Sequence, residues 1–75
     1  MVLSDIVKKL NNQESVYIKD DFEEVVIRLI PNNEEVIVYA KFKGKAEYLI
    51  DRKAKLVLDV EMNGKEISKS EYEEY

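Results

Sequence analysis

Side chains that could act as nucleophiles or bases are scarce in this 75-residue sequence. It contains no His, Cys, Trp or Thr, and its aliphatic hydroxyl groups are limited to four serines. Neither a Ser-His-Asp nor a Cys-His arrangement can therefore be assembled within the chain. A carboxylate pair could still do acid-base chemistry, but it would need a cleft that a domain of this size seldom forms. We expect a non-enzymatic protein with no catalytic residue and no cofactor.

Carboxylates are the most abundant reactive groups, and they fall into two blocks, residues 20–35 and residues 59–75. The first block has Arg28 as its single cation and consists of Asp20, Asp21, Glu23, Glu24, Glu34 and Glu35. Hard cations such as Ca²⁺ prefer oxygen ligands, but an EF-hand loop requires ligands at alternate positions and a Gly at the sixth. Because residues 20–24 lack that spacing, we interpret them as a solvated acidic turn and predict no metal site.

An array of carboxylates along one edge of a domain can also imitate the phosphates of DNA and compete for an enzyme's DNA-binding groove. The segment Leu3-Ser-Asp-Ile-Val-Lys-Lys9 is similar to the opening helix of the phage-encoded uracil-DNA glycosylase inhibitor, an acidic protein of similar size that combines a helix with an antiparallel sheet. The similarity covers these seven residues, and the acidic strand and apolar pocket of that family have no identifiable counterpart here. Small size, acidity and the absence of catalytic residues suit an accessory inhibitor of a phage or mobile element, which could act as a DNA mimic.

Hydrophobic periodicity predicts the elements that position these groups. Leu3, Ile6, Val7 and Leu10 lie on one face of a helix, with Ser4 as its expected N-cap. Alternation with a period of two predicts strands at residues 16–19, 24–30, 35–42, 46–50, 54–62 and 65–67. The segment 54–62 has the most regular alternation, and Asn63-Gly64 after it is typical of a hairpin turn. Ser68 and Glu71 have the spacing of a capping box, which predicts a short C-terminal helix.

The pairing of the strands follows from matching their apolar faces. Loops at residues 43–45 and 51–53 bring apolar side chains opposite each other, for example Val38 opposite Ile50. In the first hairpin we expect Ile18 opposite Val25. The predicted fold is a single α+β domain, residues 1–75: an antiparallel β-meander of five to six short strands, with the N-terminal helix on one face and a short C-terminal helix. A curled, barrel-like sheet is the alternative.

Basic residues cluster between the two acidic blocks. The cluster occupies residues 41–55 and consists of Lys41, Lys43, Lys45, Arg52, Lys53 and Lys55. Tyr39 and Tyr48 lie nearby in the sequence and could stack on bases. However, the net charge of the chain is −4, whereas nucleic-acid binders usually carry a positive excess. In addition, we expect cross-strand pairs that would neutralise part of the positive charge: Lys41 with Glu47, Lys45 with Asp59 and Lys19 with Glu24. Nucleic-acid binding by residues 41–55 is therefore an alternative that the charge argues against.

A protein partner is indicated by apolar residues on the second face of the predicted sheet. A lone sheet would leave that face open to water, and a contiguous apolar patch of this kind marks an interaction site. Tyrosines in the tail add to it because Tyr is enriched at binding hot spots. The predicted partner-binding residues are Val26, Ile37, Tyr39, Leu49, Val57, Tyr72 and Tyr75. The same patch could instead join two copies of the chain in a homodimer.

The sequence shows no apolar run of the ~20 residues that a bilayer requires, and its first residues lack the features of a signal peptide. A chain without Cys suits a reducing cytoplasm. We therefore predict a small acidic cytoplasmic protein that binds another protein and inhibits or modulates it, without membrane or nucleic-acid partners. The alternatives are a homo-oligomeric structural protein and the nucleic-acid-binding module already described.

Overall fold

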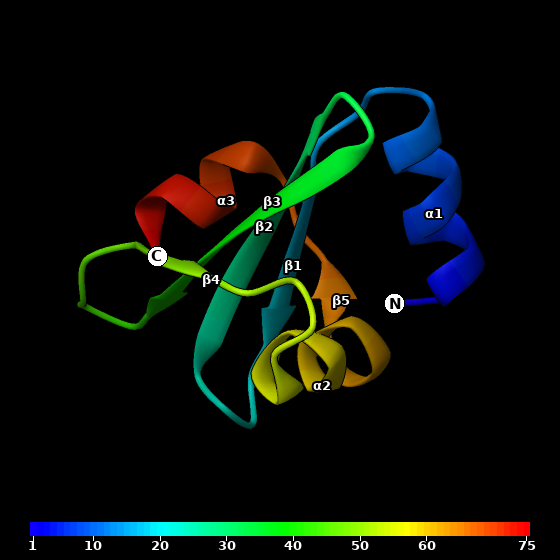
Figure 1. The fold of residues 1–75 in the computed structure, drawn as a ribbon. Coiled ribbons are helices and arrows are strands. Elements are labelled where there is room, and N and C mark those ends of the chain that lie inside the picture. Colours follow the sequence, from blue (N-terminus) through cyan, green and yellow to red (C-terminus); the bar gives the residue numbers. More distant parts are fainter.

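The computed structural model describes residues 1–75 (Figure 1). The helices are α1 (Leu3–Asn11), α2 (Lys55–Asn63) and α3 (Lys69–Glu74), and the strands are β1 (Val16–Asp20), β2 (Val25–Asn32), β3 (Glu35–Phe42), β4 (Tyr48–Ile50) and β5 (Lys65–Glu66). All strands join one antiparallel sheet in the order β4-β3-β2-β1-β5. The predicted α+β class, with an antiparallel sheet between an N-terminal helix and a short C-terminal helix, is confirmed.

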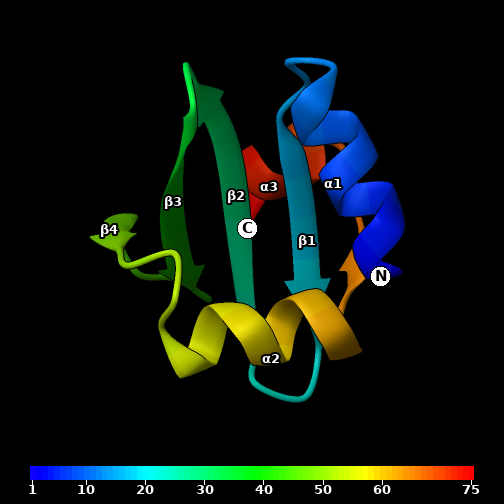
Figure 2. The same cartoon turned by 45° about the vertical axis from the view of Figure 1, so that its right-hand side comes forward.

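Helices cover both faces of the sheet. Figure 2 shows α1 and α2 on the near side of β1 and β2, and α3 behind the sheet. The larger core lies between the sheet and the first two helices and consists of Ile6, Leu10, Val16, Ile18, Val25, Ile27, Leu29, Val38, Ala40, Val57 and Val60. The smaller core lies under α3 and consists of Val26, Ile67 and Tyr72. The barrel alternative is therefore wrong, because α3 closes the second face.

The first four strands form a meander, in which one predicted register is right and one is wrong. Val38 pairs with Ile50 as the parity of the apolar faces predicted. In the first hairpin, however, Ile18 pairs with Ile27, two residues away from the predicted Val25. A shift of two residues leaves every side chain on the same face, so hydrophobic alternation cannot detect it.

The prediction of a strand at 54–62 is wrong, because this segment forms α2. Val57 and Val60 face the core at helical spacing, whereas Leu58 and Met62, which the strand pattern assigned to the core, are 46% and 67% exposed. Apolar residues occupy so many positions here that both a period of two and a helical period fit. The helix also allows the chain to cross from β4 at one edge of the sheet to β5 at the other.

Gly64 does not form the predicted hairpin turn with Asn63, since its backbone is extended, with φ −83° and ψ 176°. A Cβ at this position would lie 2.6 Å from the Val60 carbonyl oxygen and 2.7 Å from Cγ2 of Ile18. Glycine is needed because the end of α2 packs directly against β1. The following strand, β5, pairs with β1, and Ile67 after it lies on the opposite face of the sheet from Val60.

The N-terminal helix forms as predicted but begins earlier. Its N-cap is Val2, which makes no side-chain capping bond, so the predicted role of Ser4 is wrong. Ile6 and Leu10 are buried, whereas Leu3 is exposed.

The C-terminal helix is held by its predicted capping box and by a set of polar contacts. Ser68 and Glu71 exchange two hydrogen bonds of 3.1 Å. The buried Tyr72 donates its hydroxyl proton to Glu47 at 2.5 Å, and the Lys41 ammonium donates to the Tyr72 carbonyl oxygen at 2.5 Å. Together these contacts fix α3 against the second face of the sheet.

Arg28 completes this arrangement with two bonds to the Glu47 carboxylate, at 2.6 and 2.9 Å. Partial burial opposes ionisation of Glu47, but hydrogen bonds from Tyr72 and Arg28 outweigh it and hold the pKa of Glu47 below its ordinary value. Burial, followed by the same bond to Glu47, raises the pKa of Tyr72. The ionised carboxylate and the neutral phenol therefore stabilise each other.

A pair of substitutions in α2 distinguishes the helix from the predicted strand. Val60→Ala removes two buried methyl groups and should lower the free energy of unfolding by about 2 kcal/mol. Leu58→Ala should lower it by less than about 1 kcal/mol, because Leu58 faces solvent. Urea denaturation measures both. The reverse order of destabilisation would support a strand with Leu58 in the core.

The contact between α3 and the sheet predicts a pH dependence. The folded-state pKa of Glu47 lies below the ordinary 4.5, so its stabilising contribution is present above that pH and is lost as the pH falls through the folded-state pKa. Glu47→Gln should therefore lower stability at pH 7 by roughly 1 kcal/mol. As the pH falls below 4.5 and through the lower folded-state pKa, thermal melts of the variant and wild type should converge. If the difference in melting temperature between wild type and variant stayed constant with pH, the charge of Glu47 would not be the cause of that difference.

Candidate functional site

Phe22 is the most exposed large hydrophobic side chain of the molecule, with 92% of its surface accessible. It lies in the β1–β2 turn, residues 21–24, where the neighbours Asp21, Glu23 and Glu24 are all acidic and exposed. Folding gains little from an aromatic ring in this position, because the ring touches almost nothing.

The β1–β2 turn is held in place by Asp20. This residue is buried, and its Oδ1 accepts hydrogen bonds from the backbone N–H groups of Phe22, at 2.9 Å, and Glu23, at 3.2 Å. Glu24 adopts a left-handed conformation, with φ 52°, and its carbonyl oxygen accepts from Lys43 of the next loop. The turn therefore presents Phe22 from a fixed backbone. These bonds also account for the register shift: they place the turn at residues 21–24, one residue later than the loop at 20–23 between the predicted strands, and this displacement moves the pairing by two residues.

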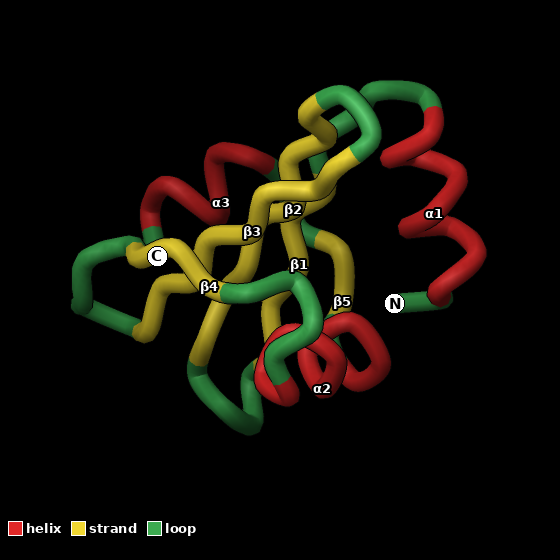
Figure 3. The backbone as a smooth tube through the Cα atoms, in the orientation of Figure 1, coloured by secondary structure: helices red, strands yellow, loops and turns green.

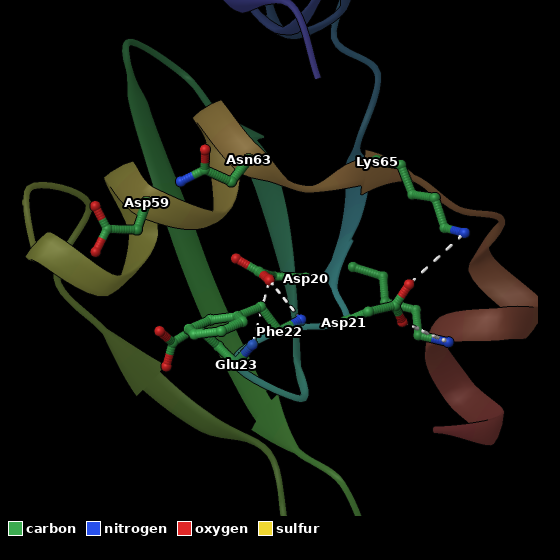
Figure 4. Close-up of a pocket in the computed structure, with 8 residues that line it drawn as sticks. Asp20, Asp21, Phe22, Glu23, Asp59, Asn63 and Lys65 are labelled. Carbon is green, nitrogen blue, oxygen red and sulfur yellow. Dashed lines mark hydrogen bonds and ion pairs between the residues drawn. The ribbon is translucent and has the colours of Figure 1, made fainter.

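A groove of about 460 Å³ lies between this turn and α2. Figure 4 shows Asp59 and Asn63 on α2 opposite the turn that carries Phe22, with Lys65 of β5 on the other side. We call it the acidic groove; its lining residues are Lys19, Asp20, Asp21, Phe22, Glu23, Asp59, Asn63 and Lys65. Phe22 is its single apolar member.

The lining of the acidic groove carries four carboxylates and two ammonium groups, a net charge of −2. Asp21 lies between both ammonium groups, 3.4 Å from Lys19 and 3.8 Å from Lys65. Glu23 has no cationic partner within the chain, and Asp59 pairs with Lys55 on the exposed side of α2. The groove contains no Ser, Thr, Cys or His, and the structure contains no group of three His, Cys, Asp or Glu side chains that could hold a metal ion. Its chemistry is that of attraction for cations.

The acidic residues of the first block do not lie along one edge. Residues 20–24 lie at the turn between β1 and β2, whereas Glu34 and Glu35 lie at the turn between β2 and β3. These turns are at opposite ends of the sheet, as Figure 1 and Figure 3 show. In addition, Asp20 is buried and bonded within its turn. The six acids of this block therefore do not form one continuous edge.

Three of the predicted partner-binding residues are buried in the folded chain. Val57 is fully buried in the larger core, because it belongs to α2 and not to the second sheet face. Val26 and Tyr72 are buried against each other in the smaller core under α3. The part of the predicted apolar patch at Val26 is the site where α3 packs. The sequence pattern could not show this, because it does not reveal where the short terminal helix folds back.

The other predicted partner-binding residues are accessible to different degrees. Tyr39 is half-buried, with the Arg28 guanidinium 4.6 Å from its ring centre, and Tyr75 packs partly against the smaller core. Ile37 and the 66% exposed Leu49 lie at the sheet edge formed by β4. A shallow groove of about 400 Å³ there, the β4-edge groove, is lined by Val36, Ile37, Val38, Leu49, Ile50, Asp51 and Arg52.

Half of the basic block is engaged within the chain. Lys41 bonds to α3, Lys55 lies 3.0 Å from Asp59, and Arg52 forms an ion pair with the buried Glu61. Burial raises the pKa of Glu61, and Arg52 offsets part of this effect. The predicted pair of Lys45 with Asp59 does not form, because Asp59 belongs to a helix. Nor does Lys19 pair with Glu24, since Lys19 lies opposite Val26.

Sequence reasoning did not identify Phe22 as a functional residue. The signal was its position: an aromatic residue between two pairs of acids, at the interruption between two strands. No strand parity assigns such a residue to the core. Its environment in the turn, which determines that it is exposed, depends on bonds from Asp20 that no periodicity reports.

Comparison with known proteins places the chain in a family. The three helices, of six to nine residues, fall short of the ~20 apolar residues that a bilayer requires. No curated protein and no solved structure matches the chain. The model of one protein family, described as Tis1 immunity protein, matches residues 6–74 and so spans the fold from α1 to α3. The chain belongs to the Tis1 immunity protein family.

Proposed function

We propose that this protein binds a toxin protein and neutralises it. The observation that carries the proposal is the match to an immunity protein family over residues 6–74. The chemistry of the chain agrees with it, because a sequence without His or Cys offers no nucleophile and base of the usual kinds. One molecule of this protein then neutralises one toxin molecule by binding to it, without catalytic turnover. We propose the cytoplasm as the place of action, since a chain without Cys needs no oxidising compartment.

A molecule of this size can form a stable complex through one end. Its accessible surface is 4979 Å², and a standard interface takes about 800 Å² from each partner. The fold is suited to this because both sheet faces are covered, so the exposed groups are held on a rigid frame and little entropy is lost on binding.

Two grooves have an exposed large apolar side chain in their lining and are candidates for the toxin contact. One is the acidic groove with Phe22 beside it, and the other is the β4-edge groove with Leu49. They share no residue, so substitutions can separate them. The β4 edge also suits self-association, because an open strand edge can pair with another copy. A homodimer is thus the competing use of that edge, and it is tested by the molar mass of the free protein.

Titration of toxin activity tests the proposed function. The probe is the toxin of the same pair, taken as the product of the gene that adjoins this one. Increasing amounts of this protein should abolish toxin activity at about one equivalent, with a complex of one toxin and one immunity molecule by light scattering. Co-expression should restore growth of cells that produce the toxin. Inactivation of the toxin by a small fraction of an equivalent would indicate an enzyme. The absence of both a complex and protection of the cells would refute the proposal.

A further inference from the structure

We infer that Phe22 is the anchor of the toxin complex: it inserts into an apolar pocket on the toxin, and Lys or Arg side chains flanking that pocket enter the acidic groove. This inference rests on the proposed function and specifies which surface carries it.

Folding does not account for the position of Phe22. The second Phe of the chain, Phe42, stacks on Tyr48 at a centroid distance of 6.4 Å and packs against the larger core. Phe22 is 92% exposed and has no such partner. Interface cores are enriched in aromatic residues, and burial of a whole ring on association uses surface that folding has left unused.

The turn is also prepared for binding. Hydrogen bonds that the N–H groups of Phe22 and Glu23 donate to Oδ1 of Asp20 fix the backbone before any partner arrives. The ring therefore needs only its own side-chain rotation to be ordered in the complex, which limits the entropy lost on binding. A residue that merely lay on a loose loop would lack this support.

The charge around Phe22 defines the partner's chemistry. The acidic groove has a net charge of −2, and Glu24 beside it adds a further carboxylate. Neither Glu23 nor Glu24 has a cationic partner in the chain, and Asp59 remains 43% exposed beside Lys55. A cationic rim on the toxin would be attracted to these groups over several ångströms, whereas an anionic surface would be repelled.

The β4-edge groove makes a weaker case for a charged partner. Five of its seven lining residues are apolar. Arg52, its single cation, is already paired with the buried Glu61. The groove contains Asp51 but no group of free charges that would select one partner, so the observations favour the Phe22 surface.

Three alanine variants locate the interface. Phe22→Ala should melt at the same temperature as wild type and bind the toxin at least tenfold more weakly, mainly through faster dissociation. Leu49→Ala examines the β4 edge, and Val7→Ala, an exposed apolar residue on α1, is the matched control. Both should bind like wild type by surface plasmon resonance.

A second set of variants examines the charge. Glu23→Gln combined with Asp59→Asn should slow association several-fold at low salt, and the difference should shrink at high salt. Glu34→Gln with Glu35→Gln removes the same formal charge at the opposite end of the sheet and is the control. Equal effects of the two double variants would show that only net charge matters and would overturn the cationic rim.

The outcomes separate this inference from the proposed function. If wild type binds the toxin and Phe22→Ala binds equally well, the anchor is refuted while the function stands. Loss of binding in Leu49→Ala alone would place the interface at the β4 edge. If wild type fails to bind the toxin at all, both the function and the anchor fall.

Discussion

The structure depends on coverage of both faces of one small sheet by a chain of 75 residues. β1 lies where the layers meet: Ile18 packs into the core under α1 and α2, while Tyr17 on the other face contacts Tyr72 of α3, with ring centres 5.5 Å apart. A domain of this length buries only about 60% of its unfolded surface, so a missing helix would leave a large share of the core open. The lack of a Cβ at Gly64 allows α2 to pack close enough to close this arrangement.

This coverage determines which surface is left for a partner. The second sheet face, which alone would be an apolar interface, is used for the packing of α3 through Tyr72 and Glu47. Apart from the outer sides of α1 and α2, apolar groups stay exposed at the β4 edge, with Leu49, and at the β1–β2 turn, with Phe22. At that turn a buried carboxylate, Asp20, supports an exposed ring, Phe22. Packing and binding thus use different parts of the chain.

The sequence was sufficient for features that local rules determine. The capping box of Ser68 and the pairing of Val38 with Ile50 follow from spacing and parity, and both are present. The sequence was insufficient where two periods fit equally, as in α2, and where a shift of two residues preserves the faces, as in the first hairpin. The return of α3 over Val26 is a long-range event that no local pattern reports. Phe22 was missed for a different reason: its exposure depends on the local hydrogen bonds that Asp20 accepts within the turn, which hydrophobic periodicity does not report.

The central claim is that the end of the molecule at the β1–β2 turn meets the toxin. Amide NMR spectra of the ¹⁵N-labelled protein, recorded as the paired toxin is added, test it most directly. The account predicts that the signals of residues 21–24 and 59–63 shift, while those of the opposite turn around Asn33 keep their positions. Shifts confined to residues 48–52 of the β4 edge, with residues 21–24 unchanged, would contradict it.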